Sequence, residues 1–181
     1  MAESSKRPDR DDLQRLQDFL ADKRNLVVLS GAGISVGSGI PTYRDEAGNW
    51  KRSNPIQHQD FMSRKSARHR YWLRSYSGWP AVASAVPSPS HHAIAELERR
   101  KIVKMVVTQN VDRLHQHAGS RSVIDLHGRL DEVICMCCQK VIPRHDLQLE
   151  LTLLNPSFSQ QGEIAPDGDA EVAEDSVPFI A

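Results

Sequence analysis

Three short polar motifs contain residue types that bind nucleotides and move protons. They are Gly31-Ala32-Gly33-Ile34-Ser35, Thr108-Gln109-Asn110-Val111-Asp112 and Leu126-His127-Gly128. Each motif follows a short apolar run typical of a buried strand, at residues 26–29, 103–107 and 123–126. Open α/β sheets bind ligands at the carboxyl ends of their strands. The motifs therefore predict one ligand site at one edge of such a sheet.

The glycine-rich motif is suited to a phosphate group. Gly31 and Gly33 would let the backbone approach an anion, and the start of the next helix would offer unpaired N–H groups. A tight strand-to-helix turn explains the same residues equally well. Val36 occupies the place of a third glycine, and residues 49–54 contain no acidic residue to hold a ribose. This pattern counts against a hydride-transfer dehydrogenase.

The other two motifs combine amides, a carboxylate and a histidine. Gln109 and Asn110 supply both donors and acceptors, and Asp112 could accept from a carboxamide or from ribose hydroxyls. Asn110 alone could equally form an Asx turn that caps the next helix. His127 has the chemistry of a general base, although a lone histidine is more often only a hydrogen-bonded residue. His115 and His117 are weaker candidates because residues two apart do not share a helical face.

The cysteines are clustered at Cys135, Cys137 and Cys138. An odd, clustered set is a poor disulfide framework and suggests a reducing compartment. Cys135 and Cys138 have the Cys-x-x-Cys spacing of half a tetrahedral zinc site. Taken alone, this spacing is equally consistent with a metal site, with a redox pair and with no function.

The remaining sequence predicts the elements that position these motifs. Residues 1–10 are expected to be disordered, and residues 131–145 to form a cysteine-bearing ribbon. Residues 41–59 are predicted to be a loop, 80–90 a connector, and 155–181 an acidic loop. Helices are predicted over residues 11–24, 34–40, 60–76, 91–101, 111–118 and 146–154. The βαβ order requires a parallel sheet, so we predict a Rossmann-like domain over 11–130 and the start of a small zinc-binding module over 131–181.

Composition narrows the class of protein. The chain has 181 residues and a formal net charge of zero, which suits one domain plus a small module. Its basic excess outside the acidic C-terminal part is too diffuse to predict nucleic-acid binding. No apolar run approaches the ~20 residues of a membrane span, so we expect no membrane partner. Residues 1–12 have neither a secretory apolar region nor a typical transit-peptide composition.

In combination, the motifs resemble the sirtuins, the NAD-dependent protein lysine deacylases. The resemblance runs from about residue 12 to the end of the chain. It also includes Ser38-Gly39-Ile40-Pro41 with Tyr43-Arg44, and Leu114-His115 with Ala118-Gly119. Further segments, such as Gly78-Trp79-Pro80 and residues 165–169, resemble the class II, sirtuin-4-like branch. The implied fold is a Rossmann-like parallel sheet with helices on both faces, incomplete here, plus a zinc-ribbon-like module.

The resemblance implies a role for each motif. His127, as general base, and Asn110 would be the catalytic residues. NAD would be bound by Gly31, Ala32, Gly33, Ser35, Ile40, Pro41, Tyr43, Arg44, Gln109, Asn110 and Asp112. The partner would be an acylated-lysine protein, whose carbonyl oxygen attacks C1′ of the ribose as nicotinamide leaves. The implied activities are lysine deacylation and ADP-ribosyl transfer.

Some features depart from the family pattern. Thr42 stands where sirtuins usually have Asp, and Val36-Gly37 replaces a Thr-Glu-like pair. Cys135 and Cys138 would supply only half of the zinc site, because the sequence contains no second Cys-x-x-Cys. We therefore expect a truncated sirtuin, and the alternative is an inactive fragment or a partner-binding remnant. The resemblance implies a mitochondrial matrix location, with the cytoplasm as the alternative, and a half-built sheet predicts self-association.

Overall fold

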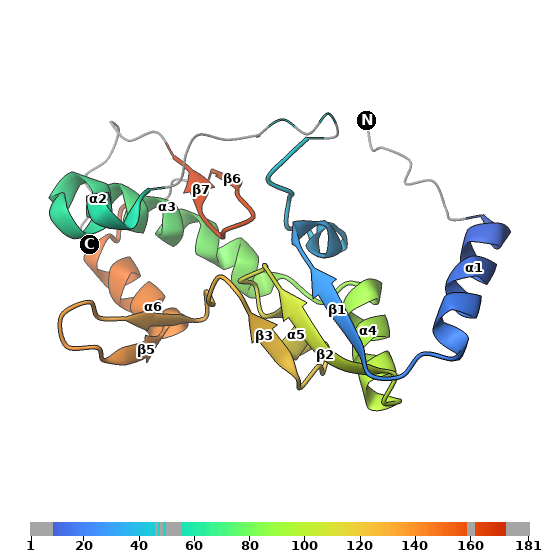
Figure 1. Cartoon of the computed structure of the whole chain (residues 1–181). Helices are drawn as coiled ribbons and strands as arrows, with labels where there is room; N and C mark the ends of the chain where they lie inside the picture. Colours follow the sequence, from blue (N-terminus) through green and yellow to red (C-terminus); the bar gives the residue numbers. More distant parts are fainter. Residues whose placement is uncertain (1–8, 46, 48, 50–55, 159–161, 173–181) are drawn as a thin grey trace.

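The central sheet has three parallel strands (Figure 1). The computed structural model describes residues 9–45, 47, 49, 56–158 and 162–172. The strands are β1 (Leu26–Ser30), β2 (Val103–Thr108) and β3 (Val123–Asp125), in the order β1-β2-β3. Ser30 lies beside Thr108, and Thr108 lies beside Asp125. This register confirms the predicted parallel sheet and aligns the three strand ends that precede the polar motifs.

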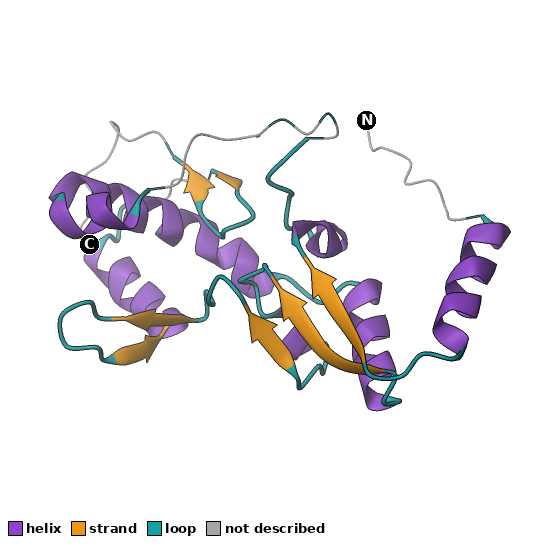
Figure 2. Cartoon of the chain, in the orientation of Figure 1, coloured by secondary structure: helices purple, strands orange, loops and turns teal. Residues whose placement is uncertain are grey.

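Short helical segments follow the strands. The segment η1 (Ala32–Ser38) is a 3-10 helix, where we predicted a helix over 34–40, and it ends at Gly39, whose φ is 84°. The helix α5 (Leu114–His117) starts later than predicted because Arg113 has the left-handed φ of 64°. The helix α4 (Pro89–Arg99) packs against β2 and begins at Ser88, whose hydroxyl and backbone form a capping box with His91. Figure 2 shows α4 and α5 on one side of the sheet.

The second part of the molecule is a helical layer that carries the cysteine ribbon. It comprises α2 (His58–Ser63), α3 (Lys65–Ser84), β4 (Glu132–Ile134), β5 (Val141–Pro143), α6 (Arg144–Leu154), β6 (Glu163–Ile164) and β7 (Ala170–Glu171). The predicted ribbon over 131–145 is confirmed as the antiparallel pair β4–β5. Leu73, Leu151 and Phe158 form the core that joins α3 to α6.

The helix α3 corrects the prediction that a helix ends at residue 76 and a connector covers 80–90. It continues through Pro80 to Ser84. A proline inside a helix normally leaves the carbonyl four residues earlier without its partner. Here the Gln148 side chain of α6 donates to the Tyr76 carbonyl at 3.1 Å. This contact between two helices is absent from any local sequence pattern.

The acidic segment contains regular structure where we predicted a loop. Within the predicted loop over 155–181, β6 and β7 form a small antiparallel hairpin. The hairpin turn is closed by a 2.7 Å hydrogen bond from the Ala165 amide to the Asp169 carbonyl. It packs on α3, where Gly78 makes room for the turn backbone. Residues 159–161 and 173–181 lie outside the described residues.

The N-terminal helix α1 (Arg10–Ala21) begins at Asp9, which accepts from the Asp12 amide, and so starts slightly earlier than the predicted helix over 11–24. Residues 1–8 of the predicted disordered segment lie outside the described residues. Leu13, Leu16 and Phe19 of α1 are exposed. Val27, Leu29 and Ile124 on one face of the sheet are exposed as well. No described helix is long and apolar enough to cross a membrane.

Candidate functional site

The three polar motifs meet at the carboxyl edge of the sheet. The Gln109 amide donates to the Ser30 carbonyl at 3.0 Å, and the Leu126 amide donates to the Thr108 carbonyl at 2.9 Å. These bonds continue the sheet beyond its strands. The residues predicted from separate motifs are thus neighbours in space.

His127 is held by the backbone of the neighbouring motif. Its Nδ1 lies 3.0 Å from the Gln109 carbonyl oxygen, and the side chain is otherwise exposed. A carbonyl oxygen can only accept, so Nδ1 carries the proton and Nε2 keeps its lone pair in the neutral ring. The exposed ring therefore keeps the lone pair of Nε2 to accept a proton.

Asn110, Ser35 and Asp112 form a buried hydrogen-bonded group. The Asn110 amide nitrogen donates to the Ser35 hydroxyl at 3.0 Å and to the Gly31 carbonyl at 3.2 Å. The Ser35 hydroxyl then donates to Asp112 Oδ2 at 2.6 Å. All three side chains are less than a tenth exposed. The group ties the glycine-rich turn to the amide-rich turn.

This arrangement refines the expectation for Asp112. We predicted that its carboxylate could accept from a ligand, yet both of its oxygens already accept from the protein. Oδ2 accepts from Ser35 and Oδ1 accepts from the Leu114 amide at 2.9 Å. The carboxylate thus fixes the positions of Ser35 and the start of α5.

A second buried layer lies behind this group and was missed by sequence reasoning. Ser30 donates to Thr108 at 2.9 Å and lies 2.8 Å from His115 Nε2. The His115 ring packs edge-on against His91, with 4.8 Å between centroids. His91 is fully buried, and its Nδ1 accepts from the Ser88 amide at 3.1 Å. Burial lowers the pKa of both histidines, that of His91 to about 4.

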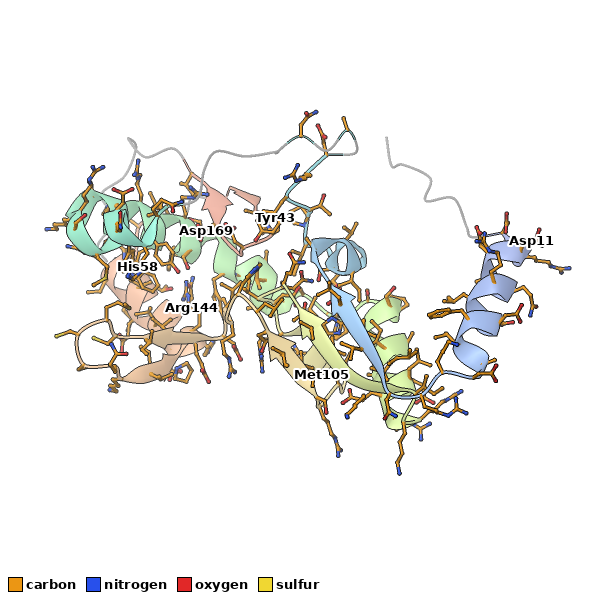
Figure 3. All side chains as sticks on the ribbon, viewed as in Figure 1. Asp11, Tyr43, His58, Met105, Arg144 and Asp169 are labelled. Carbon is orange, nitrogen blue, oxygen red and sulfur yellow. The ribbon has the colours of Figure 1, made fainter. Side chains whose placement is uncertain are left out.

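The predicted cofactor loop runs from the turn towards the β6–β7 hairpin. Ile40 is buried, whereas Pro41 is half-buried and Tyr43 and Arg44 are exposed. Figure 3 shows Tyr43 and Asp169 near one another. Partial burial, followed by the charges of Asp167 and Asp169, raises the pKa of Tyr43 to about 12. The hairpin therefore lies near the predicted cofactor loop, a proximity that the sequence did not predict.

The glycine-rich turn has room for a ligand. Among the described residues, apart from its chain neighbours, a Cβ added at Gly31 or Gly33 would meet no atom within 4 Å, and Gly33 is exposed beside the half-buried Ala32. Side chains at these positions would fill the space above the turn that an approaching phosphate needs. The turn therefore fits the phosphates of NAD.

The cysteine ribbon carries the two thiols that we predicted as zinc ligands. Cys135, Cys137 and Cys138 are exposed free thiols on the turn between β4 and β5. The backbone amides of Cys138 and Cys137 face the Cys135 sulfur and lower the pKa of its thiol. The described residues contain no group of three or more metal-binding side chains. The turn thus fits half of a structural zinc site and does not complete it.

Comparisons with known proteins agree with this architecture. The Sir2 family matches residues 31–164. The chain is 53% identical over 165 residues to an NAD-dependent protein deacetylase of Xanthomonas campestris pv. campestris, a match that covers 91% of this chain and 56% of the relative. It is 49% identical over 166 residues to the NAD-dependent protein deacylase Sirt4 of Drosophila melanogaster, a match that covers 90% of this chain and 53% of the relative.

Solved structures give the same result. A structure described as Sir2-p53 peptide-NAD+ matches with a TM-score of 0.64 and 36% identity, over 76% of this chain and 55% of that one. The chain spans about half the length of the curated relatives it matches. The likeness confirms the Rossmann-like α/β fold class. The chain belongs to the Sir2 family, the sirtuins.

Proposed function

We propose that this chain carries the NAD-binding and proton-transfer residues of an NAD-dependent protein lysine deacylase. The observation that carries the proposal is the position of His127. Its Nδ1 donates to the Gln109 carbonyl, so Nε2 keeps its lone pair, and the buried Asn110 and the open glycine turn belong to the same strand ends. These groups match the needs of a reaction that binds a dinucleotide and removes a proton from a ribose hydroxyl.

Each part of the site has a separate task in this proposal. NAD supplies an electrophilic ribose carbon and a nicotinamide leaving group. The turn at Gly31, Ala32 and Gly33 holds its phosphates, and Ile40, Pro41, Tyr43 and Arg44 close over it. Gln109 and Asn110 orient the nicotinamide ribose, while Ser35 and Asp112 hold Asn110 in place. His127 accepts the proton from the ribose hydroxyl through Nε2.

The reaction partner proposed is a protein with an acylated lysine. Relatives named as protein deacetylases and a solved Sir2 complex with a p53 peptide and NAD+ support this class. ADP-ribosyl transfer to protein is the second activity of the proposal. The matrix location stays a prediction that the likeness to Drosophila Sirt4 favours, while the Xanthomonas relative is bacterial.

The test measures nicotinamide release from NAD in the presence of an acetyl-lysine peptide. We expect release that depends on the peptide and falls by roughly 10²–10⁴ in His127→Ala, because a general base contributes about that factor. His117→Ala is the matched control, since His117 is an exposed histidine of α5 outside the site. It should leave the rate unchanged.

Three outcomes would count against the proposal. Absence of NAD binding by calorimetry would favour an inactive fragment. Release that is equal in the wild type and in His127→Ala would remove the histidine from the chemistry. Transfer of labelled ADP-ribose to protein without loss of the acetyl group would replace deacylation by transferase activity.

A further inference from the structure

A separate cavity of about 370 Å³ lies between α2, α3, the β4–β5 ribbon and the start of α6. Aromatic side chains of α2 and α3 form much of its wall, among them Phe61, Tyr71, Trp72 and Trp79. Its volume is at the lower end of the range for small-molecule sites. None of its lining residues belongs to the proposed NAD site.

Arg144 is the unusual residue of this cavity. It lines the space but is only 3% exposed. Figure 3 places its side chain between the ribbon and the long helix α3. The guanidinium lies 5.0 Å from the Trp79 ring centroid and 5.8 Å from that of Trp72. The two indole rings therefore hold the cation at a fixed position by cation–π contacts.

The hydrogen bonds of Arg144 are incomplete. Its Nη2 donates to the Ser75 carbonyl at 3.2 Å and to the Ser75 hydroxyl at 3.4 Å. Its Nη1 is buried without a hydrogen-bond partner. Within the described part of the chain, no carboxylate forms an ion pair with it. The charge of Asp169 acts on the guanidinium from a distance but does not satisfy this donor. A buried cation with an unsatisfied donor lowers stability, so this arrangement needs an explanation.

The nearby arginines are different because both have carboxylate partners. Arg129 also lines the cavity, but its guanidinium is paired with Asp131 at 2.5 Å and with Glu132 at 3.3 Å. Arg74 on α3 is paired with Asp169 at 3.6 Å. Arg144 is thus the buried cation of the cavity that forms no ion pair with a described carboxylate, and its Nη1 still lacks an acceptor. Burial lowers its pKa to about 10, which leaves it charged at neutral pH.

We propose that this cavity binds a small carboxylic acid with an aromatic body. The carboxylate takes the missing hydrogen bond from Arg144 Nη1, and the aromatic body lies among the side chains of Trp72 and Trp79. Because Arg144 itself is buried, a charge-assisted hydrogen bond to its guanidinium is stronger than one at the surface. The site is independent of NAD and of the proposed deacylase reaction.

The test compares phenylacetate with its neutral isostere phenylacetamide on the 181-residue chain, by calorimetry and by ligand-observed NMR. We expect phenylacetate to saturate one site. Phenylacetamide should bind at least about ten-fold more weakly, since it lacks the charge that strengthens a hydrogen bond to arginine.

Two variants localise the binding. Arg144→Met keeps much of the length of the side chain but removes the charge, and should weaken phenylacetate binding roughly ten-fold to a hundred-fold. Arg129→Met is the matched control and should stay within about three-fold of the wild type, because its charge is already paired. If Arg144→Met does not fold, the guanidinium ¹⁵N resonance of Arg144 in the wild type gives the same information, and should shift with phenylacetate and not with the amide.

Several results would overturn the proposal. Phenylacetate that does not saturate the chain would show that the cavity takes no such acid. Equal binding of acid and amide, or unchanged binding in Arg144→Met, would show that the guanidinium does not recognise a carboxylate. Loss of NAD-dependent activity has no bearing on these measurements, so failure of the proposed function remains distinguishable.

Discussion

Replacing Gly78 by alanine tests how α3 supports the β6–β7 hairpin. A Cβ at this position would lie 2.6 Å from the Asp169 carbonyl carbon and 2.9 Å from the Ala170 nitrogen, and closer still to the Gly168 oxygen. Carbon atoms in favourable contact are about 3.5–4.0 Å apart, so the hairpin backbone must retreat by about 1 Å. These three neighbours are all backbone atoms, so a change of side-chain rotamer cannot relieve the clash.

Two opposing terms set the size of the effect. Alanine is the better helix former by about 1 kcal/mol, which favours the variant. Overpacking costs about 1–3 kcal/mol, and a displaced hairpin also loses the largely buried Arg74–Asp169 pair, whose atoms are 3.6 Å apart. We therefore expect a net loss of about 1–3 kcal/mol in the free energy of unfolding. For a chain of this length, that lowers the Tm by roughly 2–12 °C.

The assay is thermal unfolding followed by circular dichroism, with amide hydrogen exchange on the hairpin. Faster exchange is expected at the Ala165 and Gly168 amides, whose hydrogen bonds close the turn. Ser66→Ala, at an exposed position of the same helix, is the control and should change stability by less than about 0.5 kcal/mol. A raised Tm in Gly78→Ala would refute the reasoning, because helix propensity alone would then govern the position.

Three further predictions concern the site. Ser35→Ala should lower the free energy of unfolding by about 1–3 kcal/mol in urea titrations, because it leaves Asp112 Oδ2 and the Asn110 amide without their shared partner; an unchanged midpoint would contradict this. Burial lowers the pKa of His91 to about 4 and also lowers that of His115. Below pH ~6.5 these histidines are therefore protonated in the unfolded chain while they remain neutral in the native chain. Stability should therefore fall as the pH drops from ~6.5 towards 4, and the slope should be shallower in His91→Gln than in the wild type. Equilibrium dialysis should find less than one tightly bound zinc per chain, since Cys135 and Cys138 supply half a site; tight one-to-one binding that is lost in Cys135→Ser would show that we have missed ligands.

The strand ends were predictable because each combines an apolar run with an abrupt polar turn. That local contrast is enough to locate Gly31, Gln109 and His127, and their proximity follows from the parallel order of the strands. The limits of the helices were less predictable. Pro80 predicts a helix stop from its local sequence, whereas Gln148 compensates for it from a segment 68 residues later in the chain.

The second layer behind the site could not be predicted for the same reason. His91 and His115 look like ordinary polar residues in their own helices. The contacts that bury them are not local, because Ser30 of β1 bonds His115 and the ring of His115 on α5 packs against that of His91 on α4. The Ser88-Pro89 pair is typical of a helix start, but nothing in it predicts the link to His91. The strands β6 and β7 have two residues each, which is too short for an alternating hydrophobic pattern to be detected. Only the Asp167-Gly168 pair in the turn between them could have indicated this hairpin.

The exposed face of the sheet affects how unfolding of this chain can be observed. Val27, Leu29 and Ile124 present adjoining apolar side chains to solvent in the native state, and the apolar side of α1 adds Leu13, Leu16 and Phe19. Fluorescent dyes that brighten on apolar surface will therefore bind the folded chain, and their signal will be high before any heating. The fluorescence change on melting will be small, so a flat dye trace will accompany a cooperative transition in circular dichroism.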